Sequence, residues 1–122
     1  MIRAIGNGGK SPLSPGVEVG ELVFVSGQVG TDPKTGSLEA GIEAQARMAL
    51  SRLEAILRDG GLSLTNVVKT TVYLSDVSQV SLLNSVYTEF FAPPFPARTT
   101  IGVQLPKPGL LVEIDAIAVR GK

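Results

Sequence analysis

The clearest structural signal in this chain is the segment Leu111-Val112-Glu113-Ile114-Asp115-Ala116-Ile117-Ala118-Val119. Side chains alternate between the two faces of a β-strand, and every even position from 112 to 118 is apolar, two of them alanine. A face of small apolar side chains suits helices that pack closely against it. The same alternation puts Glu113 and Asp115 together on the opposite face. The segment therefore predicts a strand with one face under helices and a second face of mixed character.

Two segments upstream predict amphipathic helices. The first has one apolar stripe at helical spacing, formed by Ile42, Ala46, Ala49, Leu50, Leu53 and Leu57. Gly60-Gly61 follow it and tolerate the left-handed cap that ends many helices. The second begins near Asp76, which has the spacing of a capping box with Gln79, and Pro93-Pro94 end it.

Strands are predicted at 22–26, 67–74 and 96–103 besides 111–119, and residues 7–16 are interpreted as a loop rich in turns. The order β, α, β, α, β, β over 1–122 predicts one α+β domain, a mixed sheet with both helices on one face. The second face is then uncovered. Charged residues make up 18% of the chain, against about 25% in typical soluble proteins. We therefore expect that face to meet other copies of the chain.

The composition excludes several kinds of chemistry. The chain has no His and no Cys, so Ser-His-Asp triads, thiolate nucleophiles and His- or Cys-bound metals are ruled out, and we expect no metal site. Eleven basic and eleven acidic residues balance to zero, which argues against nucleic acid as a partner. No apolar run approaches the roughly 20 residues of a membrane span and no signal-peptide core is present, so we expect a cytoplasmic protein.

Two charged positions are candidates for a site. Glu113 and Asp115 lie among apolar neighbours, so either this face is partly solvated or at least one of the acids lines a pocket. Arg98 follows Phe95-Pro96-Ala97 at a strand entry. Its planar guanidinium is suited to clamp a carboxylate or phosphate, and the alternative is a structural arginine that bonds loop carbonyls or Glu113.

Three further residues, one glycine and the two tyrosines of the chain, are considered for a role in a site. Gly27, after Val25-Ser26, could let a ligand approach the backbone closely or simply end a strand. Tyr73 and Tyr87 are the only tyrosines and lie on predicted regular elements among apolar residues. We therefore expect both rings in the core or in an interface.

Five segments, in this order along nearly the whole chain, resemble the Rid family, also called YjgF or L-PSP. They are 25–28 (VSGQ), 68–74 (VKTTVYL), 84–91 with Asn84, Tyr87 and Phe90-Phe91, 95–98 (FPAR) and 113–118 (EIDAIA). The last two together are quite specific, whereas either alone would be weak. Rid proteins are reactive-intermediate deaminases that hydrolyse enamines and imines.

The resemblance implies a chorismate-mutase-like fold and a homotrimer with active sites in clefts between subunits. It also implies hydrolysis of 2-imino acids, of the 2-iminobutanoate and 2-iminopropanoate type, to 2-keto acids and ammonia without a cofactor. By that likeness Arg98 holds the substrate carboxylate and Glu113 positions or activates water. The backbone around Gly27 and Thr100 binds the substrate, with Ser26 nearby, and Asn84 supports the site.

One departure from the family pattern lies near the N-terminus. Many active members carry a Tyr in an Ile-Gly-Pro-Tyr segment, and we match it to Gly16 in Leu13-Ser14-Pro15-Gly16, so a ring is expected to be missing from the pocket wall. This keeps open an alternative function, a non-catalytic trimer that binds small carboxylates through Arg98. The endoribonuclease activity by which some relatives are labelled is disfavoured. The chain has no His, no net positive charge and only a few aromatic side chains.

Overall fold

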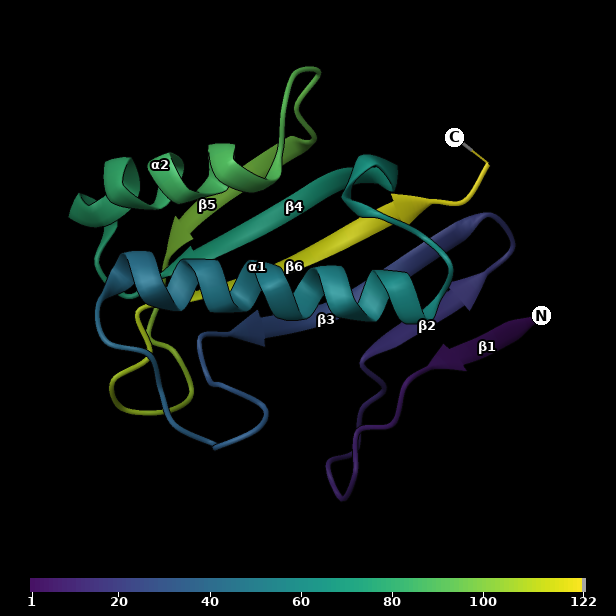
Figure 1. Ribbon diagram of the computed structural model, residues 1–122, viewed down its shortest axis with the longest axis horizontal. Coiled ribbons are helices and arrows are strands. Elements are labelled where there is room, and N and C mark those ends of the chain that lie inside the picture. The colour runs from purple at the N-terminus through teal and green to yellow at the C-terminus, as the bar shows by residue number, and fades with distance from the viewer. Residues whose placement is uncertain (122) are drawn as a thin grey trace.

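The computed structural model describes residues 1–121 and contains one six-stranded mixed sheet and one layer of helices (Figure 1). The elements in chain order are β1 (Ile2–Ile5), β2 (Gly16–Val19), β3 (Leu22–Val29), α1 (Ile42–Asp59), η1 (Leu64–Asn66), β4 (Val67–Leu74), η2 (Val77–Gln79), α2 (Val80–Phe90), β5 (Ala97–Gly102) and β6 (Val112–Val119). The strand order is β1-β2-β3-β6-β4-β5. All neighbouring strands are antiparallel except β4 and β5, which are parallel.

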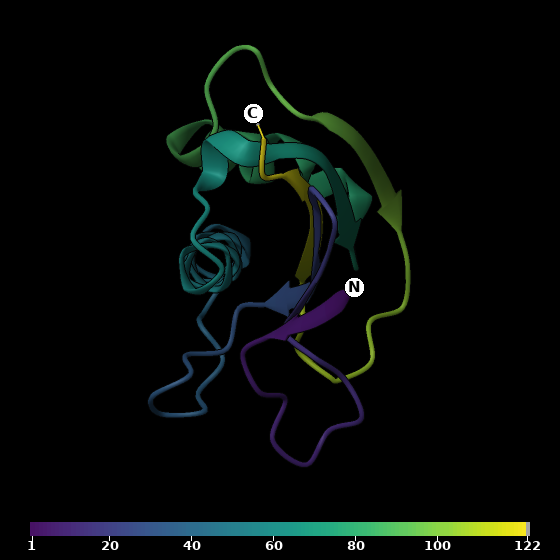
Figure 2. The ribbon, with the colours of Figure 1, turned by 90° about the vertical axis from the view of Figure 1, so that its right-hand side faces the viewer.

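The helices cover one face of this sheet, as predicted. Figure 2 shows α1 and α2 on the same side of a curved sheet. Along β6, the even positions are buried beneath the helices and the odd positions are partly exposed on the second face. We call the second face the open face. Its strands β3 and β5 expose large apolar side chains, with Leu22, Phe24 and Ile101 at 40%, 41% and 39% exposure, so this face is apolar and uncovered in a single chain.

The sequence-based boundaries need three corrections. β1 and β2 were not predicted, because each has only four residues. They add at one side of the sheet, where β2 pairs with β3 and β1 pairs with β2. The second helix starts later, since residues 77–79 form a separate 3₁₀ turn. The capping box is also absent: Asp76 accepts a hydrogen bond from the Ser78 amide, while Gln79 Oε1 is buried and has no partner. Among residues 1–121, no helix has the length and apolar character needed to cross a bilayer.

A β-bulge interrupts β3 where it crosses β6. Val25 pairs with Ala116 and Gln28 pairs with Ile114, so Ser26 and Gly27 together lie opposite the single residue Asp115. A bulge of this kind bends the strand and takes backbone groups out of the regular ladder. It therefore creates an irregular patch of backbone directly beside the acids of β6.

Candidate active site

Glu113 projects from β6 onto the open face, across the bulge of β3. Val29 of β3 and Tyr73 of β4 are its neighbours in register. A Cβ atom added at Gly27 would stand 2.8 Å from Glu113 Cδ and would overlap Oε2, so the carboxyl lies directly over the Gly27 backbone. The close approach that the sequence suggested for Gly27 therefore exists, and its partner is the Glu113 side chain.

The surroundings of Glu113 favour its protonated form more than water does for an exposed glutamate. Burial raises the pKa of its carboxyl, and the neighbouring charge of Asp115 raises this pKa further. Within residues 1–121, no Lys or Arg forms an ion pair with Glu113. A carboxyl in this state accepts a proton more readily than an exposed one, which is the property of a general base.

Ser26 lies at the same bulge, but its hydroxyl is already engaged. Ser26 Oγ donates to the Ser14 carbonyl at 2.6 Å, and the Ser26 amide donates to the Pro15 carbonyl at 2.9 Å. The buried Gln28 side chain donates to the Ser26 carbonyl at 3.0 Å. The first two bonds tie the N-terminal loop to the bulge and the third braces the bulge itself, so Ser26 holds the backbone next to Glu113 in position.

Arg98 lies elsewhere, on the helix side of the sheet. It pairs in parallel register with Thr70, and Thr70 is completely buried beneath α2. The Arg98 guanidinium stacks over the Tyr87 ring, 4.9 Å from its centroid, within the range of a cation–π contact. Among residues 1–121 no carboxylate forms an ion pair with Arg98, so the structural role as a partner of Glu113 is excluded within one chain.

The Arg98 guanidinium opens into a cavity of about 350 Å³ between α2 and the entry of β5. Its lining consists of Asn84, Tyr87, Thr88, Phe95, Pro96 and Arg98. The Tyr87 hydroxyl is hydrogen-bonded to Thr70 Oγ1 at 2.8 Å, and burial raises the Tyr87 pKa, so the ring is held as a rigid neutral floor. One cation in a largely apolar cavity is suited to a small molecule with one anionic group.

The structure brings the predicted site residues together in two groups. Arg98 and Thr100 are two positions apart on β5 and lie on the helix side, with Asn84 at the same cavity. Ser26, Gly27 and Glu113 gather at the bulge, where Glu113 faces the open side. The sheet separates Arg98 from Glu113 in a single chain, so one small molecule cannot contact both side chains of the same chain.

Gly16 is buried at the start of β2, and a side chain there would point at Ile5 and Ile56. Leu13 and Pro15 of the same segment line a hollow of about 460 Å³ together with Ser26, Gly27 and Ile56. The segment therefore borders the bulge, and the effect of glycine at position 16 stays a prediction.

Sequence reasoning missed two contributions to the site. Phe95 was quoted only as part of a motif, yet it lines the Arg98 cavity and is half exposed. Tyr73 was expected in the core or an interface. It lies on the open face, and the sequence did not indicate that its hydroxyl donates to Asp115 Oδ2 at 2.7 Å. The alternation of β4 carries the signal for Tyr73, because odd positions of this strand share a face with Glu113.

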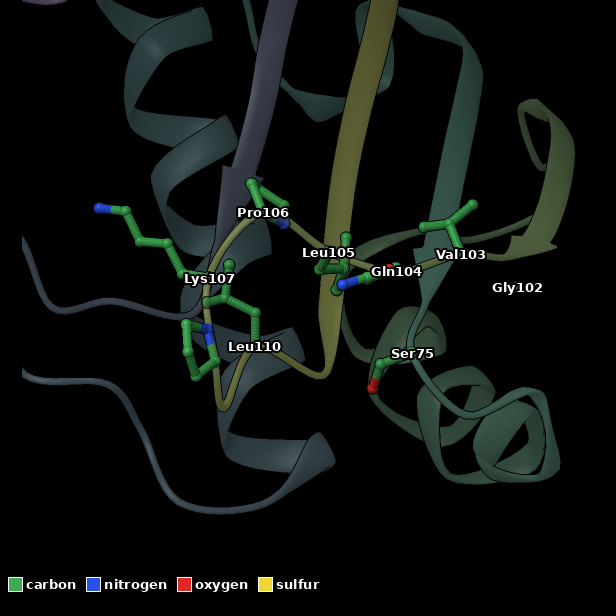
Figure 3. A pocket seen from close by; sticks show the side chains of 9 residues that line it. Ser75, Gly102, Val103, Gln104, Leu105, Pro106, Lys107 and Leu110 are labelled. Atoms are coloured by element: carbon green, nitrogen blue, oxygen red, sulfur yellow. The ribbon is translucent and has the colours of Figure 1, made fainter.

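A hollow larger than those beside Arg98 and the bulge lies apart from both groups. Its volume is about 640 Å³, and it is formed by the loop between β5 and β6 with Ser75 and Leu110 (Figure 3). None of the candidate residues from the sequence lines it. The candidate site therefore rests on the chemistry of Arg98, which has no ion-pair partner among residues 1–121, and of Glu113, whose pKa is raised, rather than on volume.

Comparison with known proteins gives consistent matches along the chain. The family described as "Endoribonuclease L-PSP" matches residues 7–120. The 2-iminobutanoate/2-iminopropanoate deaminase of Salmonella typhimurium is 42% identical over 113 residues, covering 89% of this chain and 88% of the relative. The human protein of the same name is 38% identical over 115 residues, covering 93% of this chain and 84% of the relative.

Solved structures agree with these matches. RidA from the Antarctic bacterium Psychrobacter aligns with a TM-score of 0.86 at 40% identity, covering 90% of this chain and 89% of the other. Escherichia coli TdcF, described with bound serine, aligns with a TM-score of 0.90 at 37% identity, covering 97% of this chain and 98% of the other. The α+β architecture predicted from the sequence is therefore confirmed.

Proposed function

This chain belongs to the L-PSP family, the Rid or YjgF family that its sequence resembles, and on that premise we propose that it is an imine deaminase. It hydrolyses 2-imino acids of the 2-iminobutanoate and 2-iminopropanoate type to 2-keto acids and ammonia, with no cofactor. The relatives that carry this activity in their names are 38–45% identical over most of the chain. A cytoplasmic location remains a prediction, to be checked by cell fractionation.

The observation that carries the proposal is the Arg98 guanidinium, which has no acidic partner among residues 1–121 and opens into an apolar cavity. A guanidinium bonds both oxygens of a carboxylate at once. The stacking on Tyr87 fixes the plane of the guanidinium. In this proposal Arg98 holds the substrate carboxylate, the backbone at Thr100 adds hydrogen bonds, and Asn84 supports the cavity wall.

Glu113 supplies the proton transfers. A protonated imine is already electrophilic, so hydrolysis needs an oriented water and one base rather than a metal. Glu113 accepts a proton from a water molecule as the oxygen of that water attacks C2 of the imine. The resulting amino alcohol receives that proton on nitrogen, and the C–N bond breaks as the hydroxyl oxygen forms the new carbonyl. The hydroxyl proton passes to the departing ammonia, so ammonium and the 2-keto acid leave. One water is consumed, and Glu113 returns to its starting state.

The complete site needs two copies of the chain. Arg98 lies on the helix side of the sheet and Glu113 on the open face, so Arg98 of one copy must meet Glu113 and Gly27 of another. The exposed apolar side chains of the open face favour such an assembly. We propose the homotrimer that the family resemblance implies, to be measured by sedimentation.

One alternative has a specific observation in its favour. The related TdcF structure is described with bound serine, and serine carries a carboxylate. A trimer that only binds small carboxylates would need Arg98 but would have no use for Glu113. The perturbed Glu113 carboxyl over Gly27 therefore favours the deaminase.

The test is hydrolysis of imines generated in situ by an amino-acid oxidase. Wild type, Arg98→Ala and Glu113→Ala are compared, with Arg58→Ala and Glu54→Ala as controls, because these two residues form an exposed ion pair on α1. We expect faster 2-keto acid release with wild type and both controls, and loss with both site variants. If wild type gives no acceleration over buffer for several imino acids, the deaminase proposal fails, and retained carboxylate binding would support the alternative.

A further inference from the structure

Asp115 is a second carboxylate on the open face, two residues beyond Glu113 on β6. Residues two apart on one strand face are separated by about 7 Å between Cα atoms. Two carboxylates so close repel each other, and such a pair is costly unless one of them has a hydrogen-bond donor. The proposed function has no role for Asp115, so its presence beside Glu113 needs another explanation.

Tyr73 provides the donor. It is the register neighbour of Glu113 on β4, yet its hydroxyl reaches diagonally past Glu113 and donates to Asp115 Oδ2 at 2.7 Å. Diagonal contacts of this kind are within reach of an aromatic side chain on a sheet. The bond raises the pKa of Tyr73, with burial adding to the effect, so the phenol stays protonated and keeps donating at neutral pH.

We propose that Tyr73 and Asp115 are a positioning pair for Glu113, in which the Tyr73 hydroxyl anchors Asp115 Oδ2 so that a fixed negative charge stands beside the Glu113 carboxyl. The inference rests on the proposed function for its catalytic meaning. It assigns different roles to the two acids of β6. Asp115 is the member that accepts the Tyr73 hydroxyl, and Glu113 is the member that exchanges a proton.

The other charged groups near Glu113 leave this role to Asp115. Within the described part of the chain, Lys69 is the remaining charged residue on this face of β4 and β6. Lys69 pairs with Ile117, farther along the sheet than Asp115, and its Nζ donates to Thr71 and Thr99. On the β3 side, Glu113 meets Val29 and Gly27, which do not titrate. The nearest negative charge is thus that of Asp115, consistent with the raised Glu113 pKa.

The consequence concerns the strength of the base. A carboxylate beside a fixed negative charge binds a proton more tightly, and proton transfer from water improves as the pKa of the base approaches the working pH. Removal of the Asp115 charge should therefore lower the pKa of Glu113. The acid limb of the kcat/KM profile, where Glu113 loses its proton, should move to lower pH.

The closing experiment measures the Glu113 carboxyl directly, by carbon NMR titration of the full chain with labelled glutamate and assignment by Glu113→Gln. The variants are Asp115→Asn and Tyr73→Phe, each close to the original in size. The matched control is Asp59→Asn, which makes the same charge change at the far end of α1. Thermal unfolding of each variant checks that it is folded, and the pH profile of imine hydrolysis is recorded in parallel.

We expect the Glu113 titration midpoint to fall in Asp115→Asn, to fall by less in Tyr73→Phe, and to stay at the wild-type value in Asp59→Asn. An unchanged midpoint in Asp115→Asn overturns the proposal, and a midpoint that moves only in Asp115→Asn overturns the anchoring role of Tyr73. Because the titration does not depend on turnover, shifted midpoints in a protein that hydrolyses no imine would refute the proposed function and leave the electrostatic pair standing.

Discussion

Replacement of Gly27 by alanine tests the proposed site through a single methyl group. The added Cβ would stand 2.8 Å from Glu113 Cδ and 3.0 Å from Cγ, and it would overlap Oε2. Heavy atoms in normal contact are about 3.5 Å apart or more. Glu113 Cδ must therefore retreat by about 0.7 Å, the difference between 3.5 and 2.8 Å, and Oε2 by more.

The displaced atoms are at the end of the flexible Glu113 side chain. The backbone can therefore stay in place while the carboxyl moves. The backbone at Gly27 is outside the left-handed region that only glycine favours, so alanine adds no strain of that kind. A misplacement of about 1 Å in a catalytic group lowers the rate by about 10²-fold. We expect kcat to fall by roughly that factor while the melting temperature changes little.

The assay is 2-keto acid release from imines made in situ, with circular dichroism melting on the same samples. Gly16→Ala is the matched control, because the nearest atom to its added Cβ would be Ile56 Cγ2 at 3.3 Å, and none of the three nearest atoms belongs to Glu113. The control should retain wild-type turnover. Wild-type kcat in a folded Gly27→Ala protein would refute the placement of Glu113 as the base.

Further outcomes follow from the same contacts. Arg98→Ala should raise KM for imino acids about 10- to 100-fold, since a hydrogen bond to a charged group contributes about 1.5–3 kcal/mol, and Arg98→Lys should restore little because it lacks the bidentate fork; steady-state kinetics measure both. Glu113→Gln should lower kcat by about 10²–10⁴-fold with little change in KM. Glu113→Gln should also melt higher than wild type at pH 7 but not at pH 4. The Glu113 pKa is raised in the folded chain. The stability that protonated Glu113 contributes is therefore present below its pKa in the unfolded chain and is lost as pH rises through its pKa in the folded chain. Equal melting differences at both pH values would contradict this sign. Tyr87→Phe should lower the free energy of unfolding by about 1–3 kcal/mol in urea titrations, because Thr70 is fully buried and would lose its hydrogen-bond partner.

The local pattern of the chain predicted most of the architecture. The 3.6-residue spacing of α1 and the alternation of β6 were confirmed, because both are properties of neighbouring residues that need no distant partner. The short strands β1 and β2 were missed for the opposite reason. Four residues carry too little periodicity, and these strands exist because β3 offers backbone hydrogen bonds to β2 and β2 offers them to β1.

The site was predictable as a list of residues and not as an arrangement. Arg98, Glu113 and Gly27 stood out by charge, by neighbours and by family likeness, all of which can be read along the chain. The neighbours of Gly16, Ile5 and Ile56, come from distant parts of the chain, so no local pattern names them. Tyr73 was undervalued because its partner, Asp115, lies on another strand.

Alternation within β6 already put Glu113 and Asp115 on one face, since consecutive side chains of any strand point in opposite directions. The side of the sheet on which Arg98 lies depends instead on the parallel register of β4 and β5, which pairs Arg98 with the buried Thr70. That register is fixed by hydrogen bonds and packing between distant residues, since Arg98 lies 28 positions after Thr70. No local pattern of the sequence encodes it. The physical consequence is an arginine and a carboxylate on opposite faces of one sheet, which one chain cannot bring to the same substrate.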